Sequence, residues 1–229
     1  MIKRESGRKV DELRPIEAKT GVIPRADGSA MFKIGNTTAY AAVYGPRELH
    51  PKFLQNPETG ILRCSYNMIA FSGSGERVRP GGNRRSKEIS LVTEKALLPV
   101  LDLSQYPNAV IDVFIELIET DAGTRCAGIC AAALALADAG IPMKDLPAAI
   151  SVGIIEDQII VDIDANEDCD IGAVDVPVCV LPRTGEITLL QMDGITTLDL
   201  LKKVIDKAIV ATKEVNKIQQ EALKKRYQA

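Results

Sequence analysis

Residues 111–140, IDVFIELIETDAGTRCAGICAAALALADAG, constrain the fold of this 229-residue chain more than any other stretch. Apolar and polar residues alternate up to the segment Asp-Ala-Gly-Thr-Arg, a pattern typical of a half-buried strand. The residues that follow are almost all small and predict a helix over 124–139. Gly128 and Ala131–Ala133 would let this helix pack closely against a sheet. Gly140 and Pro142 follow in the order that usually ends a helix.

The rest of the chain alternates short strands with helices. Tight turns containing Asp-Gly and Gly-Asn make most of the predicted strand pairs antiparallel. We therefore expect an α+β fold, with antiparallel or mixed sheets layered with helices, in one domain with two loosely similar halves, about 1–145 and 146–229. Strands are predicted at 16–23, 29–34, 38–44, 62–71, 109–119, 148–155, 158–163, 174–181 and 186–192, and further helices at 86–101 and from 197 onward.

Two loops and two helix ends complete this outline. Residues 45–60 contain three prolines and predict a long loop, and a loop rich in glycine and arginine follows the strand at 62–71. Pro99 is expected to end or bend the helix at 86–101. Thr196 and Asp199 have the spacing of a capping box at the start of the last helix.

Composition excludes several classes of site. The formal net charge is −3, so an RNA ligand would have to meet a local basic patch. His50 is the only histidine, which argues against a histidine-based triad and excludes an HExxH zinc site. The five cysteines form no Cys-x-x-Cys pair, and Cys126 and Cys130 are expected to be buried as small apolar side chains. No leader or membrane-length apolar run is visible, so we expect a cytoplasmic protein with no membrane partner.

The turn into the helix at 124–139 has the features of an anion site. A helix N-terminus presents unpaired amide N–H groups and partial positive charge. Gly123 allows a ligand to approach the backbone, Thr124 offers a hydroxyl at the cap position, and Arg125 adds a forked donor that suits phosphate oxygens. The alternative interpretation is an ordinary helix cap, with Arg125 as a surface side chain that pairs with Asp121.

Two further segments bear on the same chemistry. Arg84 and Arg85 follow a glycine-rich stretch directly before a predicted helix, although a solvated loop would look the same. Asp168, Asp170 and Asp175 lie between two predicted strands. Clustered carboxylates can raise a pKa into the range of a general acid or bind a divalent cation, while acidic loops also arise from turn chemistry alone. Together, the three segments suggest chemistry on phosphodiesters with phosphate as a reactant.

With these residues in view, the chain resembles the RNase PH family, and within it the catalytic, RNase PH-like subunits of the archaeal exosome ring. YGPRELHP, and DAGTR followed by ALADAGIPM, are highly specific for this resemblance. The similarity covers nearly the whole chain through GRKVDELRPI, GVIPRADGSAMFKIGNTTAYAAVYGPRELHPK, RRSKEIS, IDVFIELIETDAGTRCAGICAAALALADAGIPM, EDCDIGAVDVPV and ITLLQMDG.

The resemblance implies an RNase PH-like fold and a phosphate-dependent 3′→5′ exoribonuclease of the nucleotidyltransferase type, within the broad class of nucleases and hydrolases. Inorganic phosphate, the co-substrate, would attack the terminal phosphodiester of RNA and release a nucleoside diphosphate, and the reverse reaction would add nucleotides to RNA ends. The implied phosphate-binding residues are Gly123, Thr124 and Arg125, and the implied RNA-binding residues are Arg84, Arg85, Arg63, His50 and Lys52. His50 and Lys52 belong to the loop that resembles the narrow RNA entrance of the ring.

The resemblance also implies the acidic residues and the partners. Asp168 matches the general acid or metal-linked residue, and Asp175 matches a second carboxylate, so that both could hold a magnesium ion. The implied partners are single-stranded RNA, a homologous inactive RNase PH-like subunit in a hexameric ring built as a trimer of heterodimers, and RNA-binding cap subunits with OB-type or KH domains.

The chain departs from the family pattern at a few positions. Val174 stands directly before Asp175 in a Gly-Ala-Val-Asp segment that lacks the usual glutamate, and the acidic turn is one residue longer, so Asp170 could replace Asp168. Ser65 stands where a second basic residue is expected. Three alternatives remain open at this point: a free-standing RNase PH-type enzyme that trims tRNA 3′ ends, a ring subunit that only binds RNA, and a generic phosphate-binding metabolic enzyme.

Overall fold

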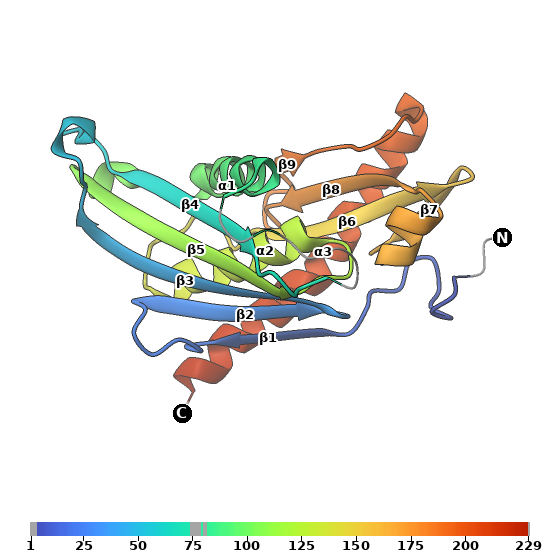
Figure 1. The fold of residues 1–229 in the computed structure, drawn as a ribbon, viewed down its shortest axis with the longest axis horizontal. Coiled ribbons are helices and arrows are strands. Elements are labelled where there is room, and N and C mark those ends of the chain that lie inside the picture. The colour runs from blue at the N-terminus through green and yellow to red at the C-terminus, as the bar shows by residue number, and fades with distance from the viewer. Residues whose placement is uncertain (1–3, 74–78, 80–81, 229) are drawn as a thin grey trace.

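The computed structural model describes residues 4–73, 79 and 82–228, which form two sheets and three α-helices (Figure 1). The larger sheet orders its strands β1-β2-β3-β5-β4, and the smaller one β7-β6-β8-β9. These strands are β1 (Ile16–Thr20), β2 (Gly28–Ile34), β3 (Thr37–Glu48), β4 (Ile61–Met68), β5 (Ala109–Glu119), β6 (Ala148–Ile155), β7 (Gln158–Val161), β8 (Val174–Val180) and β9 (Ile187–Leu190). The helices are α1 (Arg84–Leu97), α2 (Thr124–Asp138) and α3 (Leu198–Tyr227).

The predicted α+β class is confirmed. Neighbouring strands in both sheets run antiparallel, except that β4 and β5 run parallel. The Gly35-Asn36 turn joins β2 to β3 with Ile34 opposite Thr37, as the Gly-Asn signal indicates. Helices cover one side of each sheet, so the architecture is layered.

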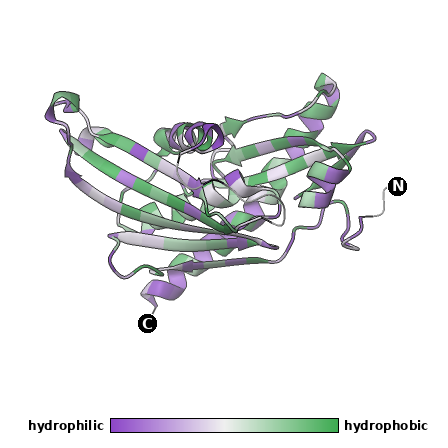
Figure 2. Ribbon diagram, viewed as in Figure 1, coloured by the Kyte–Doolittle hydropathy of each residue, from purple (hydrophilic) through white to green (hydrophobic). Residues whose placement is uncertain are grey.

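Helix α2 lies between the two sheets and contacts strands of both (Figure 1). Nearly all its residues are buried, including Cys126 and Cys130, which confirms that these cysteines pack as small apolar side chains. The approach is close at β2, where a Cβ on Gly28 would lie 2.2 Å from the backbone nitrogen of Ala139. One cluster of buried apolar side chains runs through both sheets and all three helices, while the C-terminal end of α3 is hydrophilic (Figure 2).

The other two helices begin at capped positions. Helix α1 starts two residues earlier than predicted, because Asn83 and Ser86 form a capping box there. It ends at Leu97, and a short 3₁₀ turn at Leu98–Val100 contains Pro99, as expected. The predicted cap of α3 is wrong by one residue: the side chain of Thr197, not that of Thr196, accepts a hydrogen bond from the amide of Leu200.

Two predicted loops contain regular structure. Strand β3 continues to Glu48 through a register shift between Tyr44 and Arg47, because the long strand β5 still offers it pairing partners there. A short 3₁₀ turn, Lys52–Leu54, follows in the same segment. The acidic segment between β7 and β8 contains one π-helical turn, Asn166–Asp170. Residues 74–78 and 80–81 of the arginine-rich loop lie outside the described residues.

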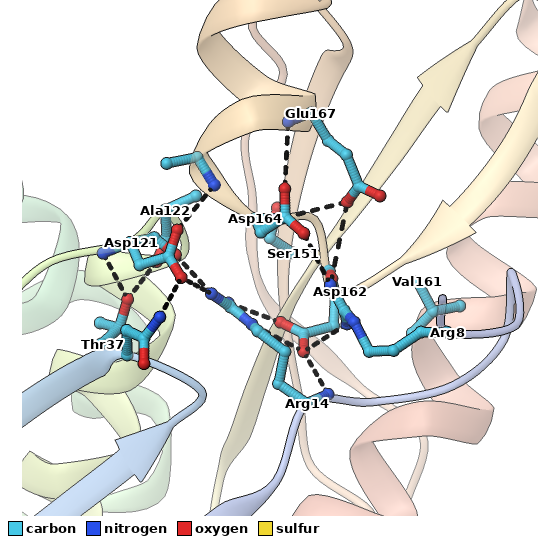
Figure 3. Close-up of polar contacts among 12 residues, drawn as sticks. Arg8, Arg14, Thr37, Asp121, Ala122, Ser151, Val161, Asp162, Asp164 and Glu167 are labelled. Atoms are coloured by element: carbon cyan, nitrogen blue, oxygen red, sulfur yellow. Dashed lines mark hydrogen bonds and ion pairs between the residues drawn. The ribbon is translucent and has the colours of Figure 1, made fainter. Parts of the chain in front are cut away.

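Three arginines near the N-terminus connect the two halves. We call residues 4–14 the arginine segment. Arg4 pairs with the buried Glu167, Arg8 with Asp164 at 3.1 Å, and Arg14 with the buried Asp162 at 2.7 Å. Arg14 also donates to the carbonyl of Asp121, so that it lies between Asp121 and Asp162 (Figure 3). The segment therefore fixes the end of β5 relative to the turn that follows β7.

Replacing Asp162 with asparagine is expected to lower the free energy of unfolding by about 3–5 kcal/mol, because the buried guanidinium of Arg14 would lose the nearer of its two counter-charges and keep only Asp121 at 3.7 Å. Asparagine tolerates the left-handed backbone at this position, where φ is +56°, so the change tests charge and not conformation. Urea unfolding followed by circular dichroism measures the effect. The exposed Lys19–Glu17 pair gives the control, since Glu17→Gln should change stability little. Equal stability of the Asp162→Asn protein and the wild type would contradict the prediction.

Candidate active site

A cleft of about 590 Å³ lies where the two sheets meet the N-terminal ends of α1 and α2. Both halves contribute to its walls: Asn83 and residues 122–125 come from the first, and Ser151 and Pro177 from the second. Six of the predicted site residues line this cleft: Arg85, Gly123, Thr124, Arg125, Asp168 and Asp175. The fold therefore brings together three segments that are far apart in the sequence.

The backbone turns sharply between β5 and α2. Ala122 and Gly123 both adopt left-handed conformations, with φ of +53° and +63°, and a left-handed alanine is uncommon. Gly123, not Thr124, occupies the N-cap position, so the prediction of a threonine cap is wrong. Thr124 is instead the first helical residue and is buried. No side chain caps the helix among the described residues, which leaves its N-terminal end directed at the cleft as an anion site.

Arg125 points across the cleft to the second half. Its Nη1 donates a 2.8 Å hydrogen bond to Oε1 of Gln191, and within the described part of the chain it forms no ion pair. The alternative in which Arg125 pairs with Asp121 is contradicted, because Arg125 bonds to Gln191 while the ion-pair partner of Asp121 is Arg14, at 3.7 Å. The guanidinium charge therefore stays uncompensated by a carboxylate within bonding distance.

The N-terminus of α1 carries a second basic group. Arg84 and Arg85 occupy its first turn, which contains no acidic residue, and neither forms an ion pair within the described residues. Cations are unfavourable at this end of a helix dipole, so the arrangement is suited to an incoming anion. Only Arg85 lines the cleft, while Arg84 is exposed beside it.

Among the described residues, three carboxylates line the cleft: Asp168, Asp175 and Asp193, the last of which was not predicted from the sequence. Asp193 pairs through its backbone with Asp175, with amide-to-carbonyl distances of 3.0 and 2.8 Å. Burial raises the pKa of Asp168, and the charge of Asp175 raises it further, while Arg125 and Arg85 oppose the shift. Burial also raises the pKa of Asp175, against a hydrogen bond from Ser151. Both carboxyl groups therefore keep their protons to a higher pH than an ordinary aspartate does.

The structure places Asp168, and not Asp170, in the wall of the cleft. Asp170 is exposed at the end of the π-helical turn. The neighbouring Glu167 is buried and bonded to Arg4, and Glu167 and Asp164 exchange backbone-to-carboxylate hydrogen bonds of 3.1 Å. The arginine segment thus holds the turn that carries Asp168.

Three predicted RNA contacts lie away from this cleft. Arg63 is bound to the buried carboxylate of Asp112, at 2.5 and 3.0 Å. His50 and Lys52 each lie 3.7 Å from Glu48, at the far end of β3 (Figure 1). None of the three lines the cleft, so their contact with RNA stays a prediction.

The donor set for a metal ion is small. Among the described residues, no group of three or more His, Cys, Asp or Glu side chains is arranged to hold a metal. Asp168 and Asp175 nevertheless face one cleft and influence each other's charge. Magnesium commonly binds through one or two carboxylates together with substrate phosphates, so these two residues fit such an ion only when phosphate completes the set.

Both halves of the chain match models of one known protein family. Residues 12–142 match the 3′ exoribonuclease family, domain 1, and residues 145–211 match domain 2 of the same family. The chain belongs to the 3′ exoribonuclease family. This confirms the resemblance to RNase PH proteins inferred from the motifs.

Relatives in archaea are similar over nearly the full length of this exoribonuclease chain. It is 53% identical to the exosome complex component Rrp41 of Thermococcus kodakarensis over 98% of this chain and 90% of that one. It is 49% identical to the Methanopyrus kandleri protein of the same name, over 98% and 93%. Among the helices that the structure describes, none is both long and apolar enough to cross a membrane.

Two solved structures share the fold. Rice Rrp46 superposes with a TM-score of 0.83 at 23% identity, covering 95% of this chain and 98% of that one. An Archaeoglobus fulgidus exosome with RNA bound to the active site matches with a TM-score of 0.81 at 22% identity, covering 94% and 92%. The RNase PH-like fold is therefore confirmed for this member of the family.

Replacing Asp175 with asparagine is expected to stabilise the fold near neutral pH, because its raised pKa shows that the folded state disfavours the charged carboxylate. In the wild type this penalty is absent below the ordinary aspartate pKa of about 3.9 and grows as pH rises toward the raised value. The gain in melting temperature should be largest at pH 7 and shrink toward pH 4, as circular dichroism would measure. Asp170→Asn, outside the cleft, is the matched control and should change the melting temperature little. A lower melting temperature for Asp175→Asn than for the wild type at pH 7 would contradict the prediction that the charged carboxylate of Asp175 destabilises the fold.

Proposed function

We propose that this chain is the catalytic subunit of an archaeal exosome ring. In this role it shortens single-stranded RNA from the 3′ end by phosphorolysis and releases nucleoside diphosphates, and in reverse it extends RNA ends. The observation that carries the proposal is the meeting of two arginine-bearing helix N-termini and coupled carboxylates in one cleft. The broad description hydrolase is wrong, because in this family phosphate, and not water, attacks the RNA.

In this proposal, RNA binds at the N-terminus of α1. Arg85 and its exposed neighbour Arg84 would hold the last phosphates of a single strand. Arginine on phosphate carries no base information, so this contact would position RNA without selecting a sequence. Arg63, His50 and Lys52 would act further along the strand, where the RNA enters the ring.

Inorganic phosphate would bind at the N-terminus of α2. Gly123 and Thr124 bring backbone amides to the cleft, and Arg125 supplies the positive charge. The bound phosphate and the terminal phosphodiester repel each other, so two separate cationic groups are needed at close range. Positioning and charge stabilisation are the main contributions that a protein makes to phosphoryl-type transfer.

The bond changes follow from this arrangement. A phosphate oxygen forms a bond to the terminal phosphorus, the bond to the ribose O3′ of the preceding nucleotide breaks, and that O3′ takes a proton. Asp168 is the proposed donor, because burial and Asp175 favour its protonated form. Asp175 would support it from the neighbouring strand β8. In the alternative scheme, Asp168 and Asp175 are both charged and would hold a magnesium ion, which would supply positive charge to the leaving oxygen in place of the proton.

The archaeal relatives, at 45–53% identity, are named exosome complex components, which supports the assembly part of the proposal. We infer that the chain works in a hexameric ring with a homologous inactive RNase PH-like subunit, capped by RNA-binding subunits with OB-type or KH domains. The proposed location is the cytoplasm.

Removing Arg125 should abolish phosphorolysis of RNA. Wild-type protein, assembled with its partner subunit, is expected to release ADP from poly(A) only when inorganic phosphate is added. Arg125→Ala should reduce this rate at least about a hundredfold, because a preorganised charge is lost from the reacting phosphate. Chromatography of the nucleotide products measures the rate. Normal ADP release by the variant, or release of AMP without phosphate, would refute the phosphate site.

Removing Asp168 should separate turnover from binding. Asp168→Ala is expected to lower the turnover rate by about 10²–10⁴-fold, the usual contribution of a general acid, while RNA affinity stays close to that of the wild type. Fluorescence anisotropy with labelled RNA measures affinity, and product release measures turnover. Asp170→Ala is the matched control and should retain activity. If Asp170→Ala were inactive and Asp168→Ala active, the acid would be assigned to Asp170.

A further inference from the structure

Gln191 connects the second sheet to the arginine of the phosphate site. It follows directly after β9, and its Oε1 accepts the 2.8 Å hydrogen bond from Arg125. Its backbone nitrogen donates to the carbonyl of Pro177 on β8 at 3.1 Å. Two residues later, Asp193 pairs with the backbone of Asp175. The side chain of Gln191 is therefore presented from a backbone that is anchored on both sides.

An amide oxygen suits this position because it carries no charge. Other arginines of the chain are bound to carboxylates: Arg14 to Asp162 and Arg63 to Asp112. Such pairs neutralise the guanidinium. An amide partner instead restricts the orientation of Arg125 and leaves its full charge, and its remaining N–H groups, for an anion. A carboxylate in the same place would compete with the phosphate.

We propose that Gln191 is the positioning residue of the phosphate site: it orients Arg125 without neutralising it, and thereby sets the affinity for inorganic phosphate. This inference rests on the proposed function, because it assigns Arg125 to phosphate. Gln191 acts through Arg125 and contacts none of the reacting atoms in this scheme. Its effect should therefore appear in the KM for phosphate and not in RNA binding.

The test compares Gln191→Glu, Gln191→Ala and the wild type in the assembled complex. Nucleoside diphosphate release is measured against phosphate concentration at saturating RNA. Gln191→Glu should raise the KM for phosphate about tenfold to a hundredfold, since an ion pair to Arg125 replaces a neutral hydrogen bond. Gln191→Ala should raise it less, because orientation is lost while the charge remains. The RNA dissociation constant, measured without phosphate, should stay within about twofold for both.

Gln228→Glu makes the same change in net charge at the exposed end of α3 and should leave the KM for phosphate unchanged. Thermal melts identify any variant that fails to fold. If Gln191→Glu does not fold, the comparison of Gln191→Ala with the wild type tests the inference. A KM for phosphate equal to that of the wild type in the folded Gln191 variants would overturn the inference, as would a fall in kcat alone. If Arg125→Ala kept the wild-type rate of phosphate-dependent release, the proposed function would fail. If Arg125→Ala lost that activity while the Gln191 variants kept the wild-type KM for phosphate, the function would stand and this inference would not.

Discussion

The packing of α2 between the two sheets is the constraint on which the rest of the structure depends. Because the helix is buried on nearly every side, its position is fixed by contacts with both sheets at once. Small side chains allow the helix to pack this closely against the sheets. At Gly28 the backbones of β2 and α2 lie so close together that even a methyl group would collide. This packing fixes the N-terminal end of the helix at the junction of the two sheets, and a preorganised anion site requires such a fixed position.

The electrostatics of the cleft differ from those of the surrounding chain. Arginines of the N-terminal segment are bound to buried carboxylates, and the protein as a whole carries a formal charge of −3. In the cleft, Arg85 and Arg125 lie at helix N-termini, where the dipole disfavours a cation, and neither pairs with a carboxylate within the described residues. Two aspartates with raised pKa face them. Both departures reduce stability, and both suit the proposed function, in which the arginines bind anions and Asp168 gives its proton to the leaving ribose oxygen.

The sequence predicted those residues of the candidate site that belong to short local patterns. Gly123 and Arg125 were found because a strand, a glycine and a helix follow one another, and Asp168 because its neighbours are acidic. Gln191 was missed because its partner, Arg125, lies 66 residues away in the sequence, and residue spacing does not predict a tertiary contact. The resemblance assigned Arg63 to RNA, yet the parallel pairing of β4 with β5 sets it opposite Asp112, a contact that no local pattern predicts. The succession of strands and helices along the chain was predictable, while the partners of charged side chains depended on the register of the strands.

Each half of the chain supplies only part of the site. The first half brings the helix N-termini, and the second brings Asp168, Asp175 and Gln191. Arg14 holds Asp121, which lies just before α2, close to Asp162, which lies a few residues before the turn that carries Asp168 (Figure 3). We therefore propose that the halves, about 1–145 and 146–229, behave as one domain, because the contacts that join them also set the geometry of the cleft. A loss of packing between the sheets would then separate the phosphate from the acid before it unfolds either half.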